Sequence, residues 1–371
     1  MELQFDTTKI YAIALEGGGA KGSYQVGVWR ALQEAGVRYN AVSGTSVGAL
    51  NGAMMAMNDL SMAEKLWKDI RFSQVIRVDD DTMKRIMNRE FENFGQFLDA
   101  MRTIRDVVFS GGFDTEPLRN LVAEHVDEEK IRNSGVEFFL STYSITDHKE
   151  MDVDARELDP GKLQDMLLAS AYFPAFKQEK IGGQNDADGG VYDAVPINAL
   201  VSRGYKDLIV IRIYGFGIER RVKIPDDVTI TTIAPHVSLG NMLNFTAENS
   251  AHNMVLGYYD AQKVLYGLNG HHFYIDRTMT EEEAYQVLAR HTSVPGVSLR
   301  ELNEEILPGL ARKLDCEGDY YDLLLALLER MAQNRGISPF KIRTDRDFHE
   351  EILQAAHRQT PDKVLDQYLL P

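Results

Sequence analysis

Two strand-turn-helix units follow one another within the first 57 residues and limit the folds open to this chain. Residues 10–15 form an apolar run rich in strand formers, and residues 20–35 carry apolar side chains at helical spacing after a glycine-rich turn. The second unit repeats this order, with a short strand at residues 39–43, a tight turn and an apolar helix at residues 49–57. Adjacent units of this kind predict an α/β fold with a parallel central sheet.

The rest of the chain predicts a core followed by a helical region. Further strand signals are found at residues 136–143, 149–153, 176–181, 208–213 and 272–275, and helical spacing at residues 61–110, 162–171 and 239–268. From residue 279 to residue 369, charged and apolar residues alternate at helical spacing. We therefore expect an α/β core at residues 1–276 and an all-helical C-terminal appendage at residues 277–371.

Composition and charge exclude several classes of protein. The chain is 44% hydrophobic and 26% charged, as in ordinary soluble domains, and its net charge of −16 opposes binding to nucleic acid or to anionic bilayers by charge alone. Its single Cys316 cannot form an internal disulfide, and we interpret it as structural. No apolar run approaches the roughly 20 residues that span a bilayer, and the N-terminus lacks a signal-peptide pattern. We expect a cytoplasmic protein without a transmembrane segment, and a homo-oligomer is compatible with the sequence.

The first turn combines small residues with one lysine. Its residues are Gly17, Gly18, Gly19, Ala20, Lys21 and Gly22. They satisfy the dinucleotide-binding pattern GxGxxG, but that fold also needs an acidic residue about 20 positions later, and residues 35–58 contain no Asp or Glu. A phosphate loop of the NTPase type is excluded because Ser23 follows Gly22. What the turn offers is a set of backbone amides at a helix start, where an anion is stabilised. Close packing of helix on strand is the structural alternative, and a dinucleotide-dependent oxidoreductase is the rival enzyme class.

The second turn has the pattern GxSxG, with Ser46 between Gly44 and Gly48. In a sharp strand-to-helix turn, glycines on both sides let the chain fold back and leave the serine hydroxyl exposed, as in a nucleophile elbow. The usual α/β-hydrolase places several strands before this turn and uses a histidine, whereas about two strands precede Ser46 here. All nine histidines follow Ser46, and none lies in a turn that is built for exposure. A histidine-based triad is therefore the weaker alternative.

A third turn follows much later, with Asp188 before Gly189 and Gly190. Alone it is typical of a hairpin. Taken in order, GGGAKG at 17–22, GTSVG at 44–48 and DGG at 188–190 resemble the signature of the patatin-like phospholipase family. Secondary matches are GGFDTEPL at 111–118, ASAYFP at 169–174 and VPIN at 195–198, so that the resemblance covers roughly residues 8–215.

The resemblance implies a three-layer α/β/α core with a mostly parallel sheet and a serine acyl hydrolase activity. It implies that Ser46 is the nucleophile, that Asp188 is its partner in a dyad, and that amides of the loop from Gly17 to Gly22 form the oxyanion hole. The implied substrates are lipid acyl esters, met at a membrane surface, and neither a cofactor nor a metal is implied. A non-catalytic lipid-binding protein on the same fold remains the alternative.

Two further features of the sequence allow two interpretations each. The charge of Lys21 either supports the oxyanion site or pairs with a carboxylate such as Glu34. Methionines are frequent after the nucleophile, where they suit either an adaptable acyl pocket or ordinary core packing. They are Met54, Met55, Met57, Met62, Met83, Met87 and Met101.

Overall fold

The computed structural model describes residues 1–75, 116–144, 149–171, 186–188, 194–215, 223–292 and 297–355. The chain divides into two compact units. The larger unit is Phe5–Ala261, and the smaller unit combines Met1–Gln4 with Gln262–Pro371. The division falls within the long helix α11 (Ala247–Tyr266), ahead of the boundary near Asp276 that the sequence suggests.

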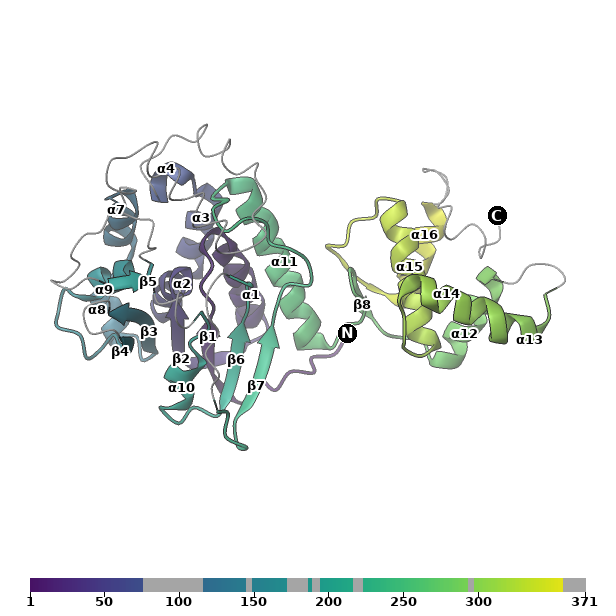
Figure 1. The fold of residues 1–371 in the computed structure, drawn as a ribbon, viewed down its shortest axis with the longest axis horizontal. Helices are drawn as coiled ribbons and strands as arrows, with labels where there is room; N and C mark the ends of the chain where they lie inside the picture. The colour runs from purple at the N-terminus through teal and green to yellow at the C-terminus, as the bar shows by residue number, and fades with distance from the viewer. Residues whose placement is uncertain are drawn as a thin grey trace. The chain divides into compact units, whose positions relative to one another are not determined.

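The larger unit is built on one sheet with the strand order β4-β3-β2-β1-β6-β7 (Figure 1). Strands β3, β2, β1, β6 and β7 run parallel, whereas β4 and a short strand β5 both run antiparallel to β3. Their bounds are β1 Ile10–Leu15, β2 Arg38–Thr45, β3 Glu137–Ser144, β4 Lys149–Asp154, β5 Asp186–Asp188, β6 Asp207–Ile211 and β7 Thr229–Ile233. The predicted α/β fold with a mostly parallel sheet is confirmed.

Helices cover both faces of this sheet. On one face, α2 (Val47–Ala56) packs so closely that a Cβ atom at Gly52 would lie 2.8 Å from the ring of Phe138 and 3.2 Å from the Val42 side chain. On the other face, α10 (Ile197–Val201) packs through Leu200. That second face contributes a cluster of Ala12, Ala14, Ala41, Phe139, Leu208 and Val210. The three layers that the resemblance implies are therefore present.

Most of the remaining helices of this unit lie close to where the sequence predicts them, but no helix was predicted at residues 128–133. They are α1 Ser23–Glu34, α3 Leu60–Asp69, α4 Phe72–Val75, α7 Glu116–His125, α8 Glu128–Asn133 and α9 Leu163–Ala171. The predicted strand at 176–181, and the methionines Met83, Met87 and Met101, lie outside the described residues. Strand β7 was not predicted, although the β-branched residues of its sequence TITTI favour a strand; within it only Ile233 is fully buried.

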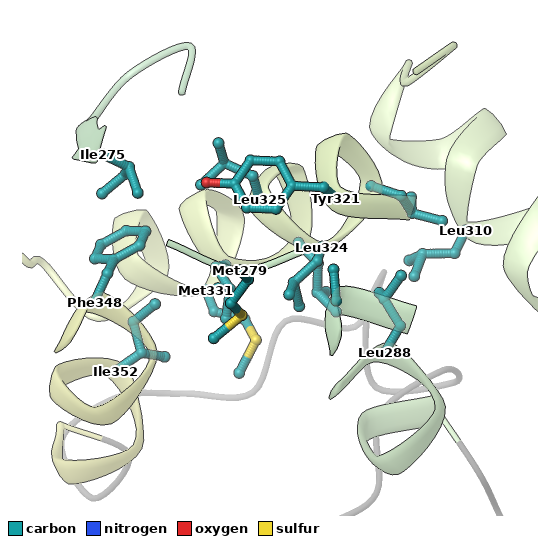
Figure 2. Close-up of a cluster of buried hydrophobic side chains, with 14 of the residues drawn as sticks. Ile275, Met279, Leu288, Leu310, Tyr321, Leu324, Leu325, Met331, Phe348 and Ile352 are labelled. Atoms are coloured by element: carbon teal, nitrogen blue, oxygen red, sulfur yellow. The ribbon is translucent and has the colours of Figure 1, made fainter. Parts of the chain in front are cut away.

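The smaller unit is mainly helical, but the prediction of an all-helical appendage is wrong in one respect. Strand β9 (Ile342–Thr344) pairs in parallel with β8 (Tyr274–Asp276), and three residues of mixed polarity give no strand signal by themselves. The helices are α12 Glu281–Thr292, α13 Leu299–Glu301, α14 Leu307–Leu314, α15 Tyr320–Asn334 and α16 Asp345–Gln354, with a π-helical turn at Leu302–Ile306. They enclose a core of Leu288, Leu310, Leu324, Phe348 and Ile352 (Figure 2).

Two histidines of this unit make its stability depend on pH. The Nε2 atoms of His291 in α12 and His349 in α16 lie 2.6 Å apart, so that one ring donates a hydrogen bond and the other accepts it. Burial lowers the pKa of both rings below 6.5; His349 and Arg335 lower that of His291 further, while Glu350 opposes the shift of His349. Because the unfolded chain then binds more protons, the free energy of unfolding falls as pH drops below about 6.5.

We expect urea unfolding to show a loss of stability between pH 7.5 and pH 5.0, and His349→Gln to reduce that loss. Glutamine keeps a hydrogen-bonding side chain at the position but does not titrate. An equal pH dependence in both proteins would contradict this prediction.

Candidate active site

Ser46 is the single residue between strand β2 and helix α2. Its backbone has φ 54° and ψ −124°, a left-handed conformation that a residue with a side chain adopts only under strain. Its carbonyl accepts the first hydrogen bonds of the helix, from the amides of Ala49 at 2.9 Å and Leu50 at 3.2 Å. Ser46 therefore stands at the positive end of α2.

Glycines make this turn sterically accessible. A Cβ atom at Gly44 would lie 2.3 Å from the carbonyl oxygen of Gly48, and one at Gly48 would lie 2.4 Å from the carbonyl oxygen of Leu15. Both distances are far below a normal contact, so neither position accepts a side chain without moving the backbone. The tight turn expected from GxSxG has this local cause.

The glycine-rich turn lies directly against Ser46. A Cβ atom at Gly17 would be 3.3 Å from the Cβ of Ser46 and 3.0 Å from the Thr45 carbonyl oxygen. Gly22, at the end of the 3-10 helix η1 (Gly19–Gly22), packs against Val47, since a Cβ there would be 2.5 Å from a Val47 methyl carbon. The first two sequence motifs therefore meet in space.

Some backbone amides of this turn donate hydrogen bonds within the protein and others do not. Gly17 donates to the Ala194 carbonyl at 3.0 Å, Ala20 to the Met242 carbonyl at 2.7 Å, and Lys21 to the Gly18 carbonyl at 3.3 Å. Within the described part of the chain, the amides of Gly18 and Gly19 have no hydrogen-bond partner. Two adjacent N–H groups of the turn that contacts Ser46 are thus not used within the described protein, and such a pair can bind an anion.

A buried carboxylate, Glu16, fixes the loop that flanks the glycine turn. Its side chain is 2% exposed and accepts hydrogen bonds from Arg212 Nε at 2.9 Å and from the amides of Ile213, Tyr214 and Gly215 at 2.7, 3.1 and 3.2 Å. Such a set of donors satisfies a buried charge. Sequence reasoning missed Glu16, although an acidic residue directly after an apolar strand was a usable signal.

Lys21 is anchored to the same flanking loop. Its Nζ donates to the Tyr214 carbonyl at 2.6 Å, and burial lowers its pKa while Glu16 opposes that shift. Glu34, the alternative partner considered from the sequence, accepts from Arg30 at 2.9 Å and from Tyr258 at 2.8 Å. The lysine Nζ is therefore held at the loop that flanks the glycine turn.

A buried polar network holds both ends of the glycine turn. Gln25 Nε2 donates to the Glu16 carbonyl at 2.7 Å, and Asn51 Nδ2 donates to the Gly22 carbonyl at 2.9 Å. Asn51 Nδ2 also bonds Gln25 Oε1 at 2.8 Å, and Trp67 Nε1 donates to Asn51 Oδ1 at 3.0 Å. Helices α1, α2 and α3 are thereby tied to one loop. Sequence reasoning missed this network, although polar residues within otherwise apolar helices were a signal for it.

Strand pairing brings the third motif, which contains Asp188, to the end of β2 where Ser46 lies. Thr45, the last residue of β2, pairs with Ser141 of β3, and Asp188, the last residue of β5, pairs with Thr142. Since β4 occupies one edge of β3 as far as Ser144, β5 must lie along the edge that β2 uses. Successive positions on a strand are about 3.3 Å apart, so the Asp188 backbone lies where β2 ends and Ser46 begins. Gly189 and Gly190 lie outside the described residues.

The described residues place neither a histidine partner for Ser46 nor a metal site at this turn. In the described part of the chain, no histidine hydrogen-bonds to Ser46; His236, for example, pairs with Asp260 at 2.8 Å. His148 and His357 lie outside the described residues. Among the residues that are described, no three His, Cys, Asp or Glu side chains gather as a metal site, and no helix has the length and apolar character to cross a membrane.

Comparison with known proteins agrees with the three turns. The family described as patatin-like phospholipase matches residues 13–201, which is half of the chain. The chain belongs to the patatin-like phospholipase family. The match contains the glycine turn, the Ser46 turn and the Asp188 turn.

Individual relatives match this chain either at low sequence identity or over a short segment. Patatin-like phospholipase domain-containing protein 7 of Rattus norvegicus is 26% identical over 207 residues, which cover 55% of this chain and 14% of the relative. Lysophospholipase nte1 of Aspergillus terreus is 54% identical over 44 residues, 12% of this chain and 3% of the relative. The chain thus spans a small part of the length of these relatives. The crystal structure of VipD from Legionella pneumophila has a TM-score of 0.42 and 14% identity, covering 96% of this chain and 81% of that one.

Proposed function

We propose that this chain is a lipid acyl hydrolase that cleaves carboxylic esters of phospholipids or related glycerolipids. Ser46 is the nucleophile, Asp188 its general base, and the amides of Gly18 and Gly19 the oxyanion hole. The observation that carries the proposal is the strained Ser46 at the start of α2, in contact with a glycine turn that keeps two amides available. This combination supplies a nucleophile and an anion site within one small volume.

The proposed reaction forms and then hydrolyses an acyl-enzyme. As Ser46 Oγ attacks the ester carbonyl carbon, its proton passes to the Asp188 carboxylate, and the carbonyl oxygen becomes an oxyanion. The tetrahedral intermediate expels the alcohol, which takes up the proton and leaves an acyl group on Ser46. A water molecule then attacks the acyl carbon while Asp188 accepts one of its protons. The bond between the acyl carbon and Ser46 Oγ breaks, Asp188 returns the proton to Ser46 Oγ, and the fatty acid leaves. Each step conserves charge and protons, and water is the only co-reactant.

The oxyanion hole carries much of the catalysis in this proposal. A carboxylate is a weak base at neutral pH, so orientation and electrostatic stabilisation must lower the barrier. Loss of one oxyanion donor typically costs about 3–4 kcal/mol. The rigid support of the glycine turn, through Glu16 and the Gln25–Asn51–Trp67 network, fits this demand.

The dinucleotide alternative has no support at the site. A dinucleotide-binding fold places an acidic residue at the end of its second strand, whereas β2 ends with Thr45 and is followed by Ser46. We propose the substrate class from the family, because the relatives compared above carry the names phospholipase and lysophospholipase. With a net charge of −16, contact with a lipid surface must come from apolar or locally basic residues.

A fluorophosphonate probe tests this function. We expect the probe to modify wild-type protein once, on Ser46, as located by peptide mass spectrometry, and wild type to hydrolyse p-nitrophenyl acyl esters. Ser46→Ala should lose both properties while keeping its circular dichroism. Labelling of another residue, or equal hydrolysis by Ser46→Ala, would overturn the assignment. A panel of glycerolipids with product mass spectrometry then identifies the substrate.

A further inference from the structure

Ser170 connects three elements at the nucleophile turn, and the proposed reaction does not use it. It lies near the end of α9, fully buried. Its Oγ accepts a hydrogen bond from the Ser46 amide at 2.9 Å and donates one to the Ser141 carbonyl at 2.6 Å. A hydroxyl has one hydrogen to donate, so both of these contacts are satisfied together.

The bridge occupies the point where the β2–β3 ladder ends. Thr45 pairs with Ser141, and at Ser46 the chain leaves the sheet for the strained turn. There the Ser170 hydroxyl joins the Ser46 amide to the Ser141 carbonyl in place of a direct strand-to-strand hydrogen bond. A serine within a helix commonly bonds a carbonyl of its own preceding turn, whereas this one bonds two other elements.

We propose that Ser170 is a positioning residue, which holds the Ser46 backbone in its strained conformation and aligns it with Asp188. This inference rests on the proposed function. The next residue of β3 after Ser141 is Thr142, which pairs with Asp188 of β5, so one hydroxyl fixes Ser46 relative to the strand against which Asp188 is paired. Because the bridge uses the Ser46 amide, that amide does not serve as an oxyanion donor.

The test compares Ser170→Ala with a matched control, Ser43→Ala. Ser43 is also a fully buried serine, and its Oγ donates to the Pro196 carbonyl at 2.8 Å from within β2. Both variants lose a buried hydroxyl, but only the first loses a bond to Ser46. Ser170→Cys is the second variant, because it keeps the bulk of the side chain but replaces the hydroxyl with a weak donor and acceptor.

We expect Ser170→Ala and Ser170→Cys to lower kcat for a p-nitrophenyl ester by about 10- to 100-fold with little change in KM, since small displacements of a nucleophile have effects of this order. Ser43→Ala should keep kcat near wild type. Equal kcat values in the Ser170 and Ser43 variants would overturn the proposal. Should Ser170→Ala fail to fold, Ser170→Cys decides the question.

Hydrogen exchange at the Ser46 amide separates this proposal from the proposed function. In Ser170→Ala, we expect that amide to exchange about 10-fold faster or more than in wild type, because its hydrogen bond is lost. In Ser43→Ala it should exchange as in wild type. If the wild type neither hydrolyses esters nor reacts with the probe, the hydrolase function fails, and faster exchange still establishes the bridge. Unchanged exchange in Ser170→Ala would refute the bridge whatever the activity.

Discussion

Asp188→Asn is expected to lower kcat by about 10²- to 10⁴-fold, the contribution that a positioned general base makes. Asparagine keeps the size and polarity of the side chain but cannot accept the proton of Ser46 Oγ, so KM should change little. The measurement is steady-state hydrolysis of a p-nitrophenyl ester, with circular dichroism as the folding check. The strand register supports this expectation, since Asp188 pairs with the β3 residue that follows the partner of Thr45.

The matched control for this experiment is Asp186→Asn. Asp186 lies in the same strand, two residues away, and pairs with Ser144 at the other end of β5. The same chemical change there should leave kcat close to wild type. If Asp188→Asn retains the wild-type kcat, or if both variants lose activity equally, then Asp188 is not the base and the dyad is wrong.

Gly19→Ala is expected to lower kcat by about 100-fold or more through damage to the oxyanion hole. Gly19 has φ +58°, and a Cβ there would lie 2.3 Å from the Met242 carbonyl oxygen, which accepts the Ala20 amide. The turn must therefore shift, and the amides of Gly18 and Gly19 shift with it. The effect should appear in kcat and in the rate of phosphonylation of Ser46.

Gly36→Ala controls for the backbone strain. Gly36 also has a positive φ, +75°, but no atom lies within 4 Å of the place its Cβ would take. We expect this variant to lose about 1 kcal/mol of stability from the left-handed conformation and to keep full activity. Normal activity in Gly19→Ala would show that the glycine turn does not stabilise the oxyanion.

The support of the glycine turn extends beyond the part of the chain that matches the family. The match ends at residue 201, yet the carbonyl of Met242 accepts the Ala20 amide and the loop at residues 212–215 receives the Glu16 carboxylate. The site is therefore a property of the whole larger unit. Residues after 201 hold the glycine turn in place through these hydrogen bonds, although the turn itself lies within the first 50 residues.

Local features of the fold and the site were predictable from the sequence. Strand β1 has the predicted bounds, and the turns around Gly44 and Gly48 follow from the absence of Cβ atoms, which is a property of the residues themselves. The glycine turn was predicted as an amide site because glycine and a helix start coincide in the sequence. Only the contacts of the folded chain show which amides of this turn donate hydrogen bonds, and on that basis we propose Gly18 and Gly19 as the oxyanion donors.

Non-local features could not be predicted in this way. The Glu16 carboxylate bonds residues almost 200 positions later, and the Ser170 hydroxyl joins Ser46 to Ser141. Such contacts depend on which strands become neighbours, and no local pattern encodes that. Strand β9 was missed for a related reason, because its three residues carry no strand signal of their own and its strand conformation depends on pairing with β8. The Thr and Ile residues of β7, in contrast, were a local strand signal that the prediction left unused.

In the proposed mechanism, Ser46 Oγ, the Asp188 carboxylate and the amides of the glycine turn meet at one point. A crystal structure of the protein phosphonylated on Ser46 would show whether they do. We expect a phosphonyl oxygen about 2.7–3.1 Å from the amide nitrogen of Gly18 or Gly19, and the Asp188 carboxylate within hydrogen-bonding distance of Ser46 Oγ. A phosphonyl oxygen directed away from these amides, with the Asp188 carboxylate remote from Ser46, would contradict it.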